Sequence, residues 1–185
     1  MRLGQASPAR ATTRLRALLK EPAPLILPGC FNAMSARILE HAGFPALYMS
    51  GYGTSLNLLG LPDAGLITLT EMALNAKLIA SAVRAPLIAD ADTGFGNAIN
   101  VVRTVEEYIR AGVAGMHLED QVAPKRCGHV AGREVIARDE AVLKIRAACQ
   151  TRDALDPDFV IIARTDARGA HGGSMEEAIT RANAF

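Results

Sequence analysis

Cysteine is scarce in this chain of 185 residues, and the three that occur lie far apart. Cys30, Cys127 and Cys149 are odd in number and form no C-x-x-C pair. They therefore fit neither a disulfide framework nor a zinc site built from paired cysteines. This usage favours a reducing compartment, and we expect a cytoplasmic protein.

The sequence also lacks an excess of charge and any long apolar run. Lys plus Arg number 20 against 19 Asp plus Glu, which gives a net charge of +1. Such a balance indicates neither a nucleic-acid-binding patch nor a polybasic membrane anchor. No uninterrupted apolar stretch approaches the roughly 18 residues that a membrane-spanning helix needs. We expect no nucleic-acid partner and no membrane partner.

Residues 1–20 contain basic side chains and no acidic one, which fits a transit peptide or an ordinary helix. Leu15, Leu18 and Leu19 recur at helical spacing, so we expect an amphipathic lead helix within residues 1–20. Half of the chain is apolar and only 21% is charged. This composition is typical of a packed globular protein, and we assign residues 1–185 to a single domain.

Short apolar runs alternate along the chain with segments of helical period. Each run is too short for a helix and predicts a buried strand. The runs lie at 25–27, 46–49, 86–89, 115–118 and 159–163. Two capping boxes, Thr68-x-x-Glu71 and Ser174-x-x-Glu177, predict where two of the intervening helices begin. The repetition of strand and helix predicts a parallel α/β fold.

Polar side chains stand where the predicted strands end, which favours a (β/α)8 barrel over an open doubly wound sheet. In a barrel all strand C-termini open onto one face, so these groups would converge on one site. Only five strand–helix units fit into 185 residues, whereas a barrel needs about eight. We therefore expect a TIM-type barrel truncated after about five units. A fragment, a wall supplied by another chain and an open architecture are the alternatives.

Asp90 and Asp92 end the third predicted strand and are spaced to point to the same side of it. Two carboxylates in this arrangement are typical of a Mg²⁺ site, because Mg²⁺ prefers oxygen ligands and keeps several waters. Glu119 and Asp63 are candidates to hold those waters. The alternative is that Asp90 or Asp92 caps the glycine-containing turn that follows.

The segment Lys125-Arg126-Cys127-Gly128-His129 places a thiol between two cations and an imidazole. This environment favours the thiolate, so Cys127 is a candidate to give or take a proton. Residues 121–133 are polar and contain proline and glycine, which predicts a long loop able to close over a site. The alternative is a solvated basic loop with an incidental cysteine. A hydrolase pair of Cys127 and His129 is disfavoured, because neighbours on a mobile loop lack an orienting partner.

Three further places are candidates to contact a substrate. Ser50-Gly51-Tyr52 follows the second predicted strand and offers a hydroxyl and flexible amides to a carboxylate, the alternative being a simple turn. Tyr48 lies on the same strand face and is a donor or, if ionised, a base, unless it serves only in packing. Arg164 offers a bidentate fork to a carboxylate, unless it pairs with a neighbouring acid.

Taken in order, several segments resemble the isocitrate lyase and phosphoenolpyruvate mutase superfamily: L-Y-M-S-G-Y-G, G-L-P-D, A-D-A-D-T-G-F-G-N, H-L-E-D-Q, K-R-C-G-H and A-R-T-D-A. The likeness runs from about Arg14 to the end of the sequence. It points to the branch with 2-methylisocitrate lyase, 2,3-dimethylmalate lyase and oxaloacetate-cleaving enzymes. The resemblance implies an (α/β)8 barrel, Mg²⁺ or Mn²⁺ as cofactor, and a homo-oligomer, usually a tetramer with a swapped helix.

The resemblance also implies roles for individual residues. Asp90 matches the direct metal ligand, and the acids that hold the metal mostly through waters are matched by Asp92, Glu119 and Asp63. The substrate-carboxylate loop is matched by Ser50, Gly51 and Tyr52, although methylisocitrate lyases generally have glycine at the position of Tyr52. The gating loop is matched by Cys127 and Gly128, with His129 beside them, and the substrate arginine by Arg164.

The implied activity is metal-dependent cleavage of a carbon–carbon bond in a small 2-hydroxy di- or tricarboxylate such as 2-methylisocitrate, which yields a 2-keto acid. Cleavage of oxaloacetate or 2,3-dimethylmalate is the alternative, and Tyr52 shifts weight toward it. Tyr48 is the candidate base, and Cys127 is the candidate proton donor to the leaving carbanion. The phosphonate-forming mutases lack the cysteine loop, which argues against their chemistry. A truncated, non-catalytic metal-binding or assembly module is a further alternative.

Overall fold

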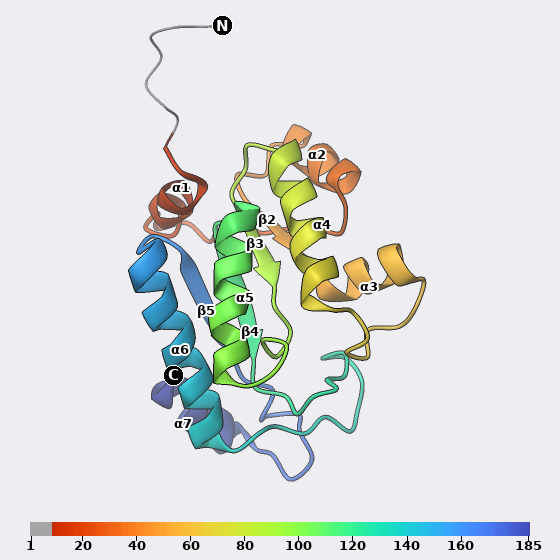
Figure 1. The fold of residues 1–185 in the computed structure, drawn as a ribbon, viewed down its shortest axis with the longest axis vertical. Coiled ribbons are helices and arrows are strands. Elements are labelled where there is room, and N and C mark those ends of the chain that lie inside the picture. Colours follow the sequence, from red (N-terminus) through yellow and green to blue (C-terminus); the bar gives the residue numbers. More distant parts are fainter. Residues whose placement is uncertain (1–8) are drawn as a thin grey trace, which may run out of the picture.

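The computed structural model describes residues 9–185, in which helices and strands alternate (Figure 1). The strands are β1 (Gly29–Cys30), β2 (Leu47–Met49), β3 (Leu87–Asp90), β4 (Gly115–Glu119) and β5 (Val160–Arg164). The helices are α1 (Ala11–Leu18), α2 (Ala33–His41), α3 (Gly51–Leu59), α4 (Leu69–Ala82), α5 (Ala98–Ala111), α6 (Arg138–Leu155) and α7 (Met175–Ala184).

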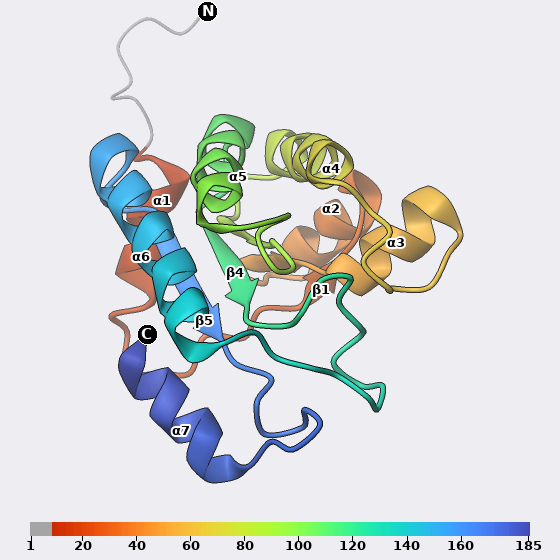
Figure 2. The same ribbon diagram turned by 60° about the horizontal axis from the view of Figure 1, so that its bottom comes forward.

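The five strands form one parallel sheet whose spatial order, β1-β2-β3-β4-β5, is their order along the chain. Helices α4, α5 and α6 lie side by side against this sheet (Figures 1 and 2). An open doubly wound sheet reverses its strand order at a switch point, and this sheet contains no reversal. The predicted parallel α/β fold is confirmed, and the described residues form a five-stranded sheet rather than a closed barrel.

The two faces of the sheet carry different side chains because successive residues of a strand point to opposite sides. The face toward the helices is apolar and belongs to the main core; its strand residues are Leu47, Met49, Leu87, Ala89, Met116, Leu118 and Ile161. The alternate positions form the second face; they include Tyr48, Ile88, Asp90, His117, Glu119, Ile162 and Arg164. The site-forming polar residues are thus interleaved one by one with the core.

Helix α1 covers the N-terminal end of the second face. Leu15 is fully buried there against Ala46, Ile88 and Val160. Burying an apolar side chain of this size stabilises a fold by roughly 1.5–3 kcal/mol. The C-terminal end of the same face is left to polar and charged side chains.

Two predicted elements differ from the structure. The apolar run at 25–27 is not a strand: β1 begins at Gly29, and Leu25 and Leu27 pack beside α1 instead. The loop or turn expected at Ser50, Gly51 and Tyr52 is the start of a helix, because Ser50 caps α3, which begins at Gly51. The other four predicted strands match β2 to β5 within two residues. The lead helix is α1, and the part of that prediction on residues 1–8 lies outside the described residues.

The two predicted capping boxes form to different extents. Thr68 and Glu71 make the complete box at the start of α4. Ser174 caps α7 by accepting a hydrogen bond from the Glu177 amide, but the Glu177 carboxylate turns to Arg138 and Arg181 instead of completing the box. Two arginines outcompete one backbone amide for this carboxylate, because bonds between ionised groups are the stronger ones.

Within the described part of the chain, the helices are too short or too polar to cross a membrane.

Candidate functional site

The C-terminal end of the second sheet face brings together side chains from four strands. Asp90 of β3 lies in register with His117 of β4, and Glu119 of β4 with Arg164 of β5. Tyr48 of β2 joins them through a hydrogen bond of 3.1 Å between its hydroxyl and His117 Nδ1. The side chains at the strand ends therefore lie close together, as expected from the parallel strands.

Asp90 is held by backbone amides on both carboxylate oxygens. The Gly51 amide donates to Oδ2 at 3.2 Å, and the Asp92 amide donates to Oδ1 at 3.0 Å. A Cβ at position 51 would lie 2.7 Å from Oδ2, so only glycine leaves room for this carboxylate. The first turn of α3 thus points at Asp90, and Ser50 caps that turn by accepting from the Gly53 amide at 3.1 Å. Tyr52 is 52% exposed on the same turn.

Glu119 and Arg164 form an ion pair of 3.0 Å between Oε2 and Nη1. Arg164 also binds Asp166, with 2.9 Å between Nη2 and Oδ1. Arg164 therefore pairs with two neighbouring acids, which is the alternative to a substrate role that the sequence left open. The other carboxylate oxygen of Glu119, Oε1, is buried, and no group in residues 9–185 hydrogen-bonds to it.

Lys125 is buried between two carboxylates. Its Nζ lies 2.5 Å from Asp63 Oδ1 and 2.8 Å from Asp92 Oδ1. Among the described residues, Asp92 Oδ1 has no polar partner besides Lys125. The sequence suggested that Lys125 lies beside the Cys127 thiol. In the structure its ammonium instead neutralises two of the predicted metal-site acids.

The predicted gating loop packs over Arg164. A Cβ at Gly128 would collide with Arg164 Nη2, so the loop backbone lies directly against the guanidinium. A partly open cavity of about 610 Å³ lies between this loop and residues 62–64; its lining includes Asp63, Lys125 and Cys127 but not Asp90, Glu119 or Arg164. Such a volume suits a small-molecule ligand.

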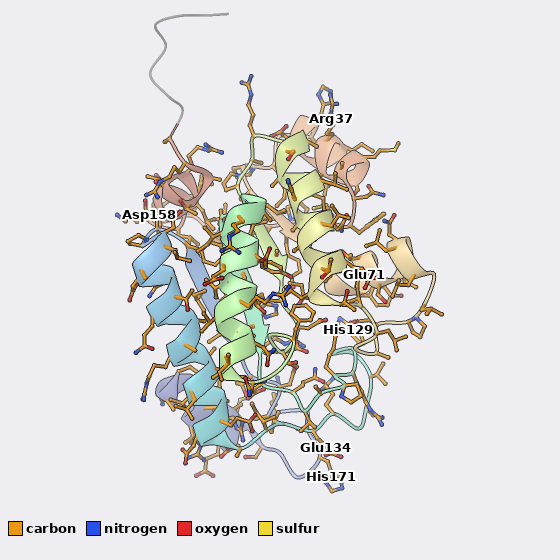
Figure 3. The ribbon with its side chains drawn as sticks, in the orientation of Figure 1. Arg37, Glu71, His129, Glu134, Asp158 and His171 are labelled. Atoms are coloured by element: carbon orange, nitrogen blue, oxygen red, sulfur yellow. The ribbon has the colours of Figure 1, made fainter. Side chains whose placement is uncertain are left out.

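His129 is exposed on this loop, and Figure 3 shows it apart from Glu134 and His171. Among the described residues, no hydrogen bond joins its imidazole to the Cys127 thiol. The arrangement does not favour a cysteine–histidine hydrolase pair.

The site contains more negative than positive charge. Four carboxylates, Asp63, Asp90, Asp92 and Glu119, face two cations, Lys125 and Arg164. Burial, followed by the charge of Asp90, raises the pKa of Asp92 to about 6. Burial raises the pKa of Glu119 to about 8, although Arg164 lowers it.

These residues fit a divalent cation of the Mg²⁺ type. In residues 9–185 no group of three acidic, imidazole or thiol side chains is close enough to form a complete metal cage. Mg²⁺ does not require one, because it is usually held by one or two carboxylates and keeps several waters. A hydrated cation near Asp90 would give the buried Glu119 Oε1 a partner and would offset the excess of carboxylates over cations. The fit of the site to Mg²⁺ is argued from these carboxylate oxygens alone.

The pKa values of Tyr48 and His117 shift in opposite directions. Burial and the charge of Asp90 raise the pKa of Tyr48 well above its ordinary range, so the phenol keeps its proton. Burial lowers the pKa of His117, although Asp90 opposes this shift. A neutral imidazole therefore lies beside a protonated phenol.

The pKa of Glu119 predicts how stability depends on pH. The folded state keeps this proton to about pH 8, whereas the unfolded chain releases it near 4.5. The folded state thus binds more protons between these values, and the free energy of unfolding falls as pH rises through that window. We expect the metal-free protein to have a lower Tm at about pH 8.5 than at about pH 7, where unfolded histidine is already largely neutral.

Thermal unfolding monitored by circular dichroism measures this effect, with Glu119→Gln as the matched variant. The variant should show a smaller decrease in Tm between the two pH values. An equal decrease in both proteins would assign the pH dependence to other groups.

Sequence reasoning missed two residues that organise the site. Gln121 binds Asp166 Oδ2 and both backbone groups of Arg126, and so fixes the base of the gating loop. Asp120 accepts hydrogen bonds from Thr165 Oγ1 and the Asp166 amide. The only signal for them was their position after Glu119 at a strand end.

Comparison with known proteins identifies the family of this chain. The family model described as phosphoenolpyruvate phosphomutase matches residues 15–185. The chain belongs to this family. Members of the phosphoenolpyruvate phosphomutase family that resemble it include 2,3-dimethylmalate lyase of Eubacterium barkeri, which is 52% identical over 172 residues. The match covers 93% of this chain and 58% of that protein.

Two further members of the family also match most of this chain and only part of their own length. The 2-methylisocitrate lyase of Escherichia coli (strain K12) is 44% identical over 180 residues, which cover 97% of this chain and 58% of the relative. A solved structure of oxaloacetate acetylhydrolase with the inhibitor 3,3-difluorooxalacetate superposes with a TM-score of 0.90 at 47% identity, covering 94% of this chain and 59% of the other. The chain spans less than two thirds of the length of these family members.

Proposed function

We propose that this chain forms part of a divalent-cation-dependent lyase that cleaves a carbon–carbon bond in a small 2-hydroxy di- or tricarboxylate, to give a 2-keto acid and a second acid. The observation that carries the proposal is an acid-rich, incompletely neutralised site with an arginine fork beside a cysteine loop. The names of the relatives, which include two lyases of this kind, support it.

We also propose that the five strands are part of a (β/α)8 barrel. The parallel strands in sequential order and the helices packed along one face support a barrel wall. The second face would then be the barrel interior, with its polar residues at the C-terminal end, where barrel enzymes carry their active sites. Further residues or another chain would supply the remaining strands.

Asp90 is the proposed direct ligand of Mg²⁺ or Mn²⁺, with Asp92, Glu119 and Asp63 acting through waters. When bound, the cation would polarise the oxygens of the substrate and stabilise the negative charge that develops on them. The chain itself fixes the Asp90 carboxylate through the Gly51 and Asp92 amides. The guanidinium of Arg164 and the first turn of α3, residues 50–52, would bind the substrate carboxylates.

Protons are moved by Tyr48 and Cys127 in this proposal. The substrate hydroxyl, which for oxaloacetate belongs to the hydrate formed when water adds to its C2 carbonyl, gives its proton to Tyr48 Oη as the phenol passes its own proton to His117 Nδ1, which lies 3.1 Å away. The electrons of the cleaved O–H bond form the new carbonyl, and the bond between C2 and C3 breaks with its pair on C3. The Cys127 thiol then protonates C3. Closure of the loop over Arg164, with Gly128 and His129 next to the thiol, would keep water out.

The first turn of α3 supports a proposal for the class of substrate. Tyr52 supplies a large exposed ring where methylisocitrate lyases generally have glycine, which favours a dimethylmalate-like or oxaloacetate-like substrate over 2-methylisocitrate. The relatives named 2,3-dimethylmalate lyase and oxaloacetate acetylhydrolase agree with this choice. The free state of all three cysteines supports a reducing, cytoplasmic setting, and the family resemblance supports a homo-oligomer.

The experiment is a panel of 2,3-dimethylmalate, oxaloacetate, 2-methylisocitrate and isocitrate, with keto-acid or oxalate formation measured in Mg²⁺ and in EDTA. We expect one substrate to be cleaved in Mg²⁺ and none in EDTA. Cleavage that persists in EDTA would contradict the cation-dependent mechanism. Binding of Mn²⁺ without cleavage of any substrate would favour the non-catalytic metal-binding module instead.

A further inference from the structure

The turn that follows β3 is unusually well anchored for a loop. Residues 90–94 include Asp92, whose φ of 46° lies in the left-handed region. A non-glycine residue in this region is strained, and such strain persists only where surrounding contacts enforce it. We call residues 90–94 the carboxylate turn, because they carry Asp90 and Asp92.

Three buried side chains from the helices behind the sheet donate to backbone carbonyls of the carboxylate turn. The bonds are Tyr108 Oη to Asp90 O at 2.6 Å, Lys144 Nζ to Thr93 O at 3.1 Å and Thr104 Oγ1 to Gly94 O at 3.1 Å. The Glu119 amide adds a fourth bond, to Asp92 O at 2.9 Å. The carbonyls of Asp90, Asp92 and Thr93 therefore each have a donor, and that of Gly94 shares the Thr104 hydroxyl with Asn100 O, which lies 3.0 Å from it.

Lys144 is the most informative of these donors. It is 5% exposed, and no carboxylate in residues 9–185 lies within ion-pair distance of its ammonium. Burial lowers its pKa, with Glu140 opposing the shift. A buried cation is destabilising unless its bonds compensate, and an apolar residue of the same length would fill this place in a helix-packing layer. The presence of a lysine at this buried position is therefore explained by its hydrogen bond to the Thr93 carbonyl.

We propose that Tyr108, Lys144 and Thr104 are positioning residues, which hold the carboxylate turn so that Asp90 and Asp92 present their carboxylates to the cation. This inference rests on the proposed function. None of the three touches the substrate side of the sheet, since α5 and α6 pack on the opposite face. They act through the backbone: when a carbonyl is released, Asp92 relaxes from its left-handed conformation and its amide leaves Asp90 Oδ1.

The test uses Tyr108→Phe and Lys144→Met, each of which removes a donor while keeping most of the side-chain volume. Lys77→Met, on the exposed face of α4, is the control for loss of a lysine. Mn²⁺ affinity is measured by electron paramagnetic resonance without substrate. We expect Kd to rise about 10-fold in both variants, as is typical when an outer partner of a metal ligand is lost, and to change less than about 2-fold in the control.

A second measurement needs no metal. Amide hydrogen exchange at Asp92 and Gly94 should become about 5- to 10-fold faster in Tyr108→Phe, because loss of one hydrogen bond changes a local equilibrium by roughly this factor. If a variant fails to fold, Thr104→Val replaces it, with Thr151→Val as its control, since Thr151 makes a similar bond to Ala147 O away from the turn.

The outcomes separate the two proposals. Wild-type Mn²⁺ affinity together with wild-type exchange in the folded variants would overturn the positioning role. A wild-type protein that binds no Mn²⁺ would overturn the proposed cation-dependent function, and the exchange rates at Asp92 and Gly94 would still decide whether the three side chains hold the turn.

Discussion

Replacing Cys127 by serine is expected to lower kcat by about 10²- to 10⁴-fold, the range typical of losing a general acid. Cys127 lines the cavity beneath the gating loop, next to Gly128, which lies against Arg164. Serine has nearly the same size but is a far weaker acid, so it cannot protonate the leaving carbanion at neutral pH. Steady-state kinetics on the substrate found in the panel measures the effect, and we expect Mn²⁺ and product affinity to change less than about 2-fold.

The matched control is Cys149→Ser, because Cys149 is a free, half-buried cysteine on α6 that lies outside the proposed mechanism. Its kcat should stay within about 2-fold of wild type once folding is verified. Wild-type turnover in Cys127→Ser would remove this thiol from the mechanism. Equal losses in both variants would show that the effect is on the fold.

Replacing Arg181 by methionine is expected to lower the free energy of unfolding by about 3 kcal/mol, the lower end for breaking a buried ion pair. Arg181 Nη1 lies 3.2 Å from Asp120 Oδ2, and both side chains are more than nine-tenths buried. Its loss leaves the Asp120 carboxylate in the interior with only Thr165 and the Asp166 amide as donors. Urea unfolding followed by circular dichroism measures the change.

Arg110→Met is the control, since Arg110 is an exposed arginine paired with Glu106 and Glu107. Pairs of this kind contribute about 0–1 kcal/mol, so the control should be nearly neutral. The double variant Asp120→Asn with Arg181→Met should recover part of the lost stability. If Arg181→Met is as mild as Arg110→Met, the buried pair contributes little and α7 is held by its apolar contacts.

Much of the fold was predictable because strands β2 to β5 read as short apolar runs, and β3 and β4 are buried on nearly all sides. The exception, β1, has only two residues, so the longer apolar segment before it gave the stronger signal while packing on α1. Helix α3 was missed because its first residues, Gly51 and Gly53, are weak helix formers. Their small size is required where the turn meets Asp90 and Phe31.

The candidate site was predictable to the extent that it depends on strand ends. Asp90, Glu119 and Arg164 come together because a parallel sheet aligns its C-terminal ends. The two partners of Lys125 were not predictable. Its ammonium lies between Asp63 and Asp92 because the loop folds back onto segments that are about 30 and 60 residues earlier in the chain. Contacts of that range leave no periodic trace in the sequence.

The one-by-one interleaving of core and site residues in β3, β4 and β5 restricts how this protein can diverge. Deleting or inserting a single residue in β4 would move Met116 and Leu118 to the ligand side and press His117 and Glu119 against the helices, because the side-chain period of a strand is two. Chain-length changes are therefore confined to the loops. New specificities can be reached by point substitution within strands or by remodelling the segments beyond their ends, while the helix-facing half of every strand stays the same.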